Sequence, residues 1–181
     1  MRTATFFGGV VRSAPADGAL ARGVGLALGQ AGFRLRHGGY NGLMEDAAGG
    51  AASAGADVIA ITLAGVDWGP FNESVTEALH LPTLGSRLDR FLDGTDLVVA
   101  MGGGVGTLHE LTAAIWYAGN VREVPILLAG RTALRLAAFL RGDRWLFETP
   151  TRPLGFLHTA VDLEEFTRTL AVLSFDSLPT S

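Results

Sequence analysis

The chain of 181 residues contains no cysteine and no lysine, so all 14 of its basic residues are arginine. Without cysteine there is neither a disulfide scaffold nor a thiolate metal site. Without lysine there is no Schiff base with pyridoxal phosphate, and no P-loop lysine of the kind that many nucleoside triphosphatases use. Any anion that the protein binds must therefore contact arginine side chains, hydroxyl groups or backbone N–H groups.

The chain is also poor in charge and in long apolar runs. Charged residues make up 18% of it and its net charge is −4, so no basic field is available to attract nucleic acid. No stretch approaches the roughly 18 uninterrupted apolar residues of a membrane span. The apolar run from Thr3 to Val11 is short and interrupted by Gly8 and Gly9, which favours a first strand over a signal peptide. We therefore expect a cytoplasmic protein that binds neither nucleic acid nor membrane.

What the chain does have is a hydrophobic content of 48%, enough for one sizeable core. No repeat or linker divides it, so we expect a single domain over residues 1–181. Short apolar runs alternate with helix-like segments, which predicts a Rossmann-like α/β fold with a doubly wound parallel sheet and helices on both faces. The expected strands are Thr3–Phe7, Phe33–Arg36, Asp57–Leu63, Glu73–Leu79, Leu97–Met101 and Val124–Ala129. The expected helices are Ala16–Ala31, Leu43–Ala54, Thr83–Asp93, Thr107–Ala118, Thr132–Leu140 and Asp162–Leu173.

Three expected strands end in glycine-rich turns, and the turn at Gly102–Gly106 is the richest, with four glycines in five residues. Glycine allows close approach of the backbone, and the N–H groups at the start of the following helix bind anions. We therefore predict a phosphate site on Gly103, Gly104, Val105, Gly106 and Thr107. Tight packing of strand against helix is an alternative explanation of the glycines. A nicotinamide dinucleotide site is disfavoured, because the next strand ends at Leu128–Arg131 without the expected acidic residue.

Glu110 lies one turn into the same helix and has two interpretations. Thr107-x-x-Glu110 fits a capping box, and on these four residues alone capping is favoured over catalysis. A carboxylate near a bound phosphate would also need a positive partner, because two such charges roughly 6 Å apart repel by about 3 kcal/mol at an effective dielectric of about 20. Arg87 and Arg90 on the preceding helix are the candidates, although a surface position is the commoner fate of a helical arginine.

A second glycine loop, from His37 to Glu45, also leads into a helix. Asn41 and Gly42 are typical of a turn, Met44 of the core, and Tyr40 either stacks on a base or covers the loop. His37 and His109 are too isolated to form a metal site, so we expect no metal and no cofactor.

Together these segments resemble the LOG (Lonely Guy) family, whose members often carry the label of possible lysine decarboxylases. The family signature PGGxGTxxE corresponds to Gly102–Glu110, and its motif GGGxxGLMG to His37–Glu45. The family has an arginine fifteen residues before the signature, and Arg87 has that spacing. Gly102 replaces the signature proline, and His37 and Glu45 replace the outer glycines of the second motif. These variants are more similar to a less characterised Rossmann-type branch of the superfamily, and the absence of lysine argues against decarboxylation.

The resemblance implies a Rossmann-like homodimer that hydrolyses a nucleoside 5′-monophosphate, such as AMP, to free base and ribose 5-phosphate. It implies that Arg87 and Glu110 are the catalytic pair and that residues 103–107 bind the phosphate. The loop that would bind the rest of the substrate comprises Gly38, Gly39, Asn41, Gly42, Met44 and Glu45. Because the superfamily also includes molybdenum-cofactor carriers and nucleotide sensors, a non-catalytic nucleotide-binding or carrier protein is the alternative.

Overall fold

The computed structural model describes residues 1–12, 14–173 and 175, and the remaining part of the expected domain lies outside this range. The strands are β1 (Arg2–Phe7), β2 (Phe33–His37), β3 (Val58–Leu63), β4 (Glu77–Leu81), β5 (Leu97–Ala100), β6 (Ile126–Ala129) and β7 (Leu157–Ala160). The helices are α1 (Pro15–Gln30), α2 (Leu43–Ser53), α3 (Leu84–Leu92), α4 (Val105–Asn120), α5 (Arg131–Gly142) and α6 (Leu163–Val172). Among the described residues, no helix combines the length and the apolar character needed to cross a membrane.

All seven strands form one parallel sheet in the order β4-β3-β2-β1-β5-β6-β7, which confirms the Rossmann-like α/β fold. The inner strands are buried on both faces; in β5, for example, every residue is buried. This is why the sequence shows continuous apolar runs rather than alternation.

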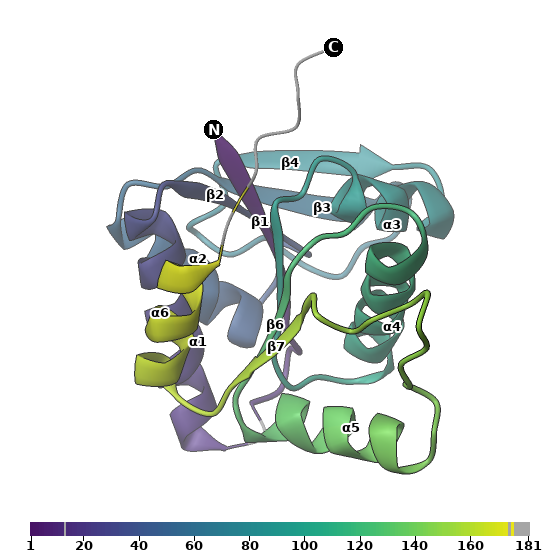
Figure 1. Ribbon diagram of the computed structural model, residues 1–181. Helices are drawn as coiled ribbons and strands as arrows, with labels where there is room; N and C mark the ends of the chain where they lie inside the picture. Colours follow the sequence, from purple (N-terminus) through teal and green to yellow (C-terminus); the bar gives the residue numbers. More distant parts are fainter. Residues whose placement is uncertain (13, 174, 176–181) are drawn as a thin grey trace.

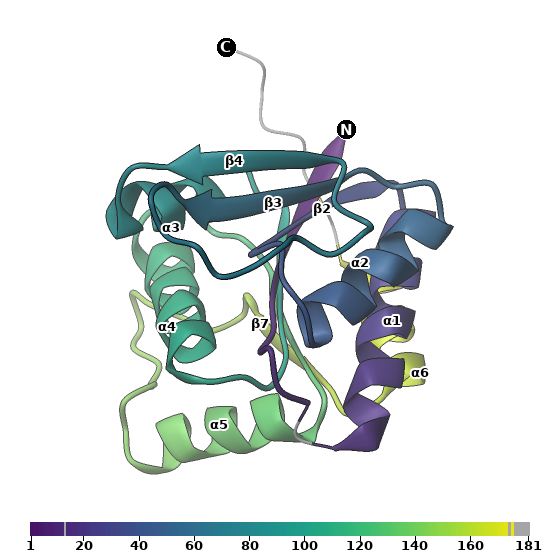
Figure 2. The ribbon, with the colours of Figure 1, turned by 180° about the vertical axis from the view of Figure 1, so that it is seen from behind.

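Helices cover the two faces of the sheet, as Figures 1 and 2 show from opposite sides. Helices α1, α2 and α6 pack on one face, over a core that includes Phe6, Leu28 and Phe166. Helices α3, α4 and α5 pack on the other, over a core that includes Phe7, Phe91 and Leu111. Phe6 and Phe7 are neighbours in β1 and point into different cores, so this central strand joins the two layers.

The observed elements differ from the expected ones at several ends, and three differences matter here. The fourth strand is Glu77–Leu81 rather than Glu73–Leu79, because Asn72 closes a turn by accepting N–H bonds from Ser74 and Val75. Strand β7 is missing from the expectations; it is a four-residue edge strand with partly exposed residues, so it lacks the two-sided apolar run that marks the others. Helix α4 begins at Val105, two residues before the expected start.

Candidate functional site

The candidate site lies at the point in the parallel sheet where the order of the strands reverses. Strands β1 to β4 follow one another toward one edge of the sheet, and strands β5 to β7 follow one another toward the other edge. The reversal therefore lies between the neighbouring strands β1 and β5. Ligands of open parallel sheets bind outside the carboxyl ends of the strands at this point. The three glycine-rich turns that follow β1, β2 and β5 all lie at that edge.

Gly9 joins these three turns through backbone contacts. Its N–H donates to the Gly102 carbonyl at 2.9 Å, and its carbonyl accepts the N–H of Leu43, at the start of α2, at 2.9 Å. A Cβ at Gly103 would lie 2.9 Å from the Gly9 nitrogen and would overlap Thr107 Oγ1. The tight-packing explanation of the glycines is therefore correct for Gly103. The sequence marked Gly8-Gly9 only as a strand end, because nothing local to it reveals contacts with turns 30 and 90 residues away.

The turn from Gly103 to Gly106 is exposed, while Thr107 is buried. In the described part of the chain, none of the five N–H groups from Gly103 to Thr107 donates a hydrogen bond to a protein acceptor. A Cβ at Gly104 or Gly106 would meet no atom within 4 Å. A cavity of about 380 Å³ opens beside the turn, toward Thr132 and Leu136 of α5. Free N–H groups at a helix N-terminus next to open space form the geometry that binds anions.

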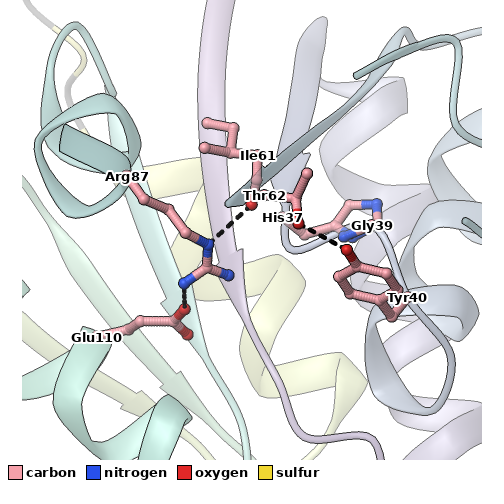
Figure 3. A network of polar contacts seen from close by, with 7 residues as sticks. All are labelled: His37, Gly39, Tyr40, Ile61, Thr62, Arg87 and Glu110. Atoms are coloured by element: carbon pink, nitrogen blue, oxygen red, sulfur yellow. Dashed lines mark hydrogen bonds and ion pairs between the residues drawn. The ribbon is translucent and has the colours of Figure 1, made fainter. Parts of the chain in front are cut away.

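Glu110 does not form the capping box that its sequence fits. The N-cap of α4 is Gly104, so Thr107 lies inside the first turn and its side chain cannot cap the helix. Glu110 instead accepts a hydrogen bond from Arg87, with Nη1 and Oε1 2.7 Å apart (Figure 3). Of the two arginines considered, the structure brings Arg87 to Glu110, whereas Arg90 lies 4.0 Å from Asp93 on its own helix.

Arg87 is held from several sides. Its Nε donates to the Ile61 carbonyl at the end of β3, at 3.0 Å, and its guanidinium lies 4.7 Å from the ring centroid of Phe91. Its remaining nitrogen, Nη2, lies 3.3 Å from the position that a Cβ at Gly38 would occupy. Gly38 thus leaves room for the guanidinium, and Nη2 has no protein acceptor among the described residues.

Burial dominates the electrostatics of the pair, whose side chains are only 12% and 13% exposed. Burial raises the pKa of the Glu110 carboxyl above its usual value, while the charge and the hydrogen bond of Arg87 act in the opposite direction. Such opposing influences on a buried carboxylate are typical of functional sites.

Helix α3, which carries Arg87, is fixed to the sheet by a second arginine. Arg36 on β2 donates from Nη1 to the carbonyls of Arg90 and Asp93, at 3.1 and 2.6 Å. These carbonyls belong to the last turn of the helix, where a cation is favourable. Burial lowers the pKa of the Arg36 guanidinium to about 10.

The second glycine loop is mostly buried, in contrast to the first. Gly38, Gly39 and Gly42 are buried, and Met44 packs against the core that contains α1 and α2, as its sequence indicated. Gly42 has φ +75°, and a Cβ there would lie 2.5 Å from the Val10 carbonyl. The exposed residues of this predicted substrate loop are Asn41 and Glu45. The following residue, Asp46, binds Arg12 through both carboxylate oxygens, at 2.6 and 2.8 Å.

His37 fixes the start of this loop. Its Nδ1 accepts the N–H of Gly39 at 2.8 Å, so its proton resides on Nε2, which finds no acceptor among the described residues. The side chain is fully buried, and this lowers its pKa to about 3. His37 is therefore a neutral, structural residue. In the described part of the chain, no group of three or more His, Asp or Glu side chains is placed to hold a metal ion.

Solved structures share this fold over nearly the whole chain. The molybdenum cofactor binding protein from the phototrophic bacterium Rippkaea orientalis is 22% identical, with a TM-score of 0.72, covering 94% of this chain and 95% of that one. The molybdenum cofactor carrier protein MCP from Chlamydomonas reinhardtii is 23% identical, with a TM-score of 0.70, covering 94% and 97%. At this level of identity the likeness establishes the fold alone.

The sequence itself assigns the family. No curated protein matches the chain. A family model, that of the SLOG cluster4 family, matches residues 2–134, which include all three glycine turns, Arg87 and Glu110. The resemblance to the LOG family is thereby confirmed in the form of a divergent branch: the chain belongs to the SLOG cluster4 family of the LOG-like superfamily.

Proposed function

We propose that the protein is a nucleoside 5′-monophosphate phosphoribohydrolase. Water would add to C1′ of the ribose as the bond to the base nitrogen breaks, and the proton lost by the water would be carried off by the base. The observation that supports this most is the buried ion pair between Arg87 of α3 and Glu110 of α4, at 2.7 Å, in which Glu110 lies on the helix that begins with the free N–H groups. Hydrolysis of this bond needs both a phosphate anchor and a carboxylate near the ribose.

Each group has a defined role in this proposal. The N–H groups of residues 103–107 bind the 5′-phosphate, and the helix dipole of α4 adds to the attraction. Glu110 lies about one turn further along α4, where its carboxylate stabilises the positive charge that develops on the ribose, an effect commonly worth a few kcal/mol. Arg87 offsets the negative charges of phosphate and carboxylate and directs its free Nη2 toward the ligand. Asn41 and Glu45, exposed on the second loop, would contact the ribose hydroxyls.

The test is to incubate the protein with a panel of nucleoside monophosphates and to measure free base and ribose 5-phosphate by chromatography. Glu110→Gln keeps the size of the side chain and an oxygen that accepts the Arg87 hydrogen bond, but removes the charge. We expect it, and Arg87→Gln, to abolish base release. Arg90→Gln, one turn later on α3, removes an arginine that is 44% exposed and should leave the rate unchanged. Turnover that survives Glu110→Gln would refute the assignment.

A second candidate is a non-catalytic carrier or sensor, and the solved relatives favour it, because those compared above are described as binding or carrying the molybdenum cofactor. The same free N–H groups would then hold a phosphate of a nucleotide-like cofactor. Binding of AMP by the wild-type protein without release of adenine would support this candidate over the hydrolase.

We also propose that the protein is a cytoplasmic homodimer. Helices α4 and α5 and the segment that follows them expose Trp116, Trp145 and Phe147 around a groove of about 360 Å³. This is the apolar surface that a second copy would cover. Sedimentation velocity should give the mass of a dimer, and Trp116→Glu should shift it toward the monomer.

A further inference from the structure

Trp68 lies in the loop between β3 and β4, and 50% of its surface is exposed. The exposed ring offers a large, rigid aromatic surface. Two other aromatic residues, Tyr40 and Phe71, lie beside it. The rings of Tyr40 and Trp68 meet edge to face with centroids 5.6 Å apart, and those of Tyr40 and Phe71 are 5.3 Å apart.

The loop that carries Trp68 is fastened to the second glycine loop. Asn72 donates from its side chain to the carbonyls of Gly39 and Tyr40, both at 3.0 Å, and from its backbone to Gly39 at 2.9 Å. Tyr40 is fixed in turn, because its hydroxyl lies 2.6 Å from that of the buried Thr62 (Figure 3). Beside Trp68, the Asp67 carboxylate accepts the N–H of Gly69 at 2.9 Å. These bonds fix the backbone of the loop and the Tyr40 ring, which contacts Trp68 edge to face, before any ligand arrives, and this reduces the entropy lost on binding.

Arg87 connects this aromatic surface to the ion pair. Its guanidinium lies 6.0 Å from the ring centroid of Trp68 and is bonded to Glu110. The contacts therefore run in the order of residues 103–107, Glu110 one turn along the same helix, Arg87 bonded to Glu110, and Trp68 beside Arg87. A nucleoside monophosphate has the same order of parts: phosphate, ribose and base.

We propose that Trp68 is the stacking surface for the base of the bound nucleotide. This inference rests on the proposed nucleotide site and assigns its base-binding part. Stacking requires only an aromatic ring, and a purine offers more area than a pyrimidine. The site is accordingly selective for purine over pyrimidine nucleotides by stacking, with Tyr40 and Phe71 holding the tryptophan in position.

The test compares ligands with and without a base. Affinities for AMP, UMP and ribose 5-phosphate are measured by calorimetry in the Glu110→Gln background, so that no ligand is consumed. Trp68→Ala should weaken AMP binding about tenfold or more, in line with the usual value of one stacked base. It should change the affinity for ribose 5-phosphate by less than twofold and reduce the preference for AMP over UMP. Trp68→Phe should restore most of the AMP affinity. Phe139→Ala removes an aromatic ring of α5 that is 56% exposed and does not line the groove of the proposed dimer, and it should change none of the three affinities.

A direct signal comes from the variant Trp116→Phe/Trp145→Phe, in which Trp68 is the remaining tryptophan of the three in the chain. AMP should quench its fluorescence, and ribose 5-phosphate should not.

An equal loss of affinity for AMP and ribose 5-phosphate in Trp68→Ala, or no loss for either, would overturn the stacking proposal while leaving hydrolysis standing. Binding of AMP that depends on Trp68, without release of adenine by the wild-type protein, would overturn hydrolysis and leave stacking standing. Failure of the wild-type protein to bind AMP would overturn both.

Discussion

The two glycine-rich loops at the carboxyl ends of β2 and β5 contain glycine for different structural reasons. The glycines of the loop from Gly38 to Gly42 are buried, and a side chain at these positions would collide with Phe71, Met44 or the Val10 backbone. In the turn after β5, only Gly102 and Gly103 are restricted in this way, by Thr132, Thr107 and Gly9. Gly104 and Gly106 face open space. Glycines of the first kind serve the fold, and those of the second kind leave room that no described residue fills.

The polar groups of the two loops differ in the same sense. In the buried loop, the Gly39 N–H is satisfied by His37 and its carbonyl by Asn72. In the exposed turn, the N–H groups of residues 103–107 have no protein acceptor within the described chain. A folded protein leaves backbone donors free where water or a ligand can reach them. In the proposed function the exposed turn would therefore bind the phosphate, while the buried glycines of the second loop hold the site in shape.

The largest expected effect concerns the buried loop. Gly42→Ala combines a positive φ with overlap of the Val10 backbone, so it should lower the free energy of unfolding by about 3 kcal/mol or more. Gly65→Ala is the matched control, because Gly65 has the same φ of +75° but open space around it, and should cost about 1 kcal/mol. Urea unfolding measures both. Equal losses would mean that backbone conformation, and not close packing, accounts for this glycine.

The second effect is a dependence of stability on pH that His37 confers. The pKa of His37 falls from 6.5 to about 3 on folding, so the unfolded chain binds a proton more readily than the folded one. Stability must therefore decrease as the pH falls from about 6.5 toward 3, with a loss of about 2 kcal/mol between pH 7 and 5. His37→Asn keeps an acceptor for the Gly39 N–H and cannot titrate. The difference between wild-type and variant unfolding energies should shrink by that amount at pH 5; a constant difference would show that His37 is accessible to protons.

Most of the fold could be predicted from the sequence, because strands buried on both faces and helices bounded by glycine leave strong local patterns. β7 could not, since a four-residue edge strand in which only Leu157 and Ala160 are buried has no such pattern. The capping box at Thr107 and Glu110 failed for a related reason: the sequence fits it, but helix α4 starts earlier, with Gly104 as its N-cap, and the competing partner of Glu110 is 23 residues away. The Ile61 carbonyl, which positions Arg87, carries no signal in the sequence at all. Contacts between distant segments decided the site, whereas local patterns decided the fold.

The third prediction places a charge on the exposed turn. Val105 is 84% exposed at the first position of α4, so Val105→Asp should fold normally and gain about 0.3 to 1 kcal/mol from the helix dipole. The same carboxylate would repel a phosphate held by the neighbouring N–H groups, and we expect AMP and ribose 5-phosphate to bind roughly tenfold more weakly. Val105→Asn is the neutral control and should bind as the wild type does. Unchanged affinity in Val105→Asp would move the phosphate away from this turn.

The smallest expected effect compares two glycines of helix α4 that both have room for a methyl group. Gly106 lies in the first turn of α4, and a Cβ there would meet no atom within 4 Å. Gly119 lies near the end of α4, where a Cβ would make an ordinary contact of 3.7 Å with Phe156. Alanine at either position should raise the free energy of unfolding by about 0.5 to 1 kcal/mol, because glycine is a poor helix former. Only Gly106→Ala should also weaken AMP binding, since its methyl group occupies the space beside the free N–H groups. If both variants gained stability and bound AMP equally well, the open space at Gly106 would not belong to the ligand, and the phosphate would lie nearer Gly104.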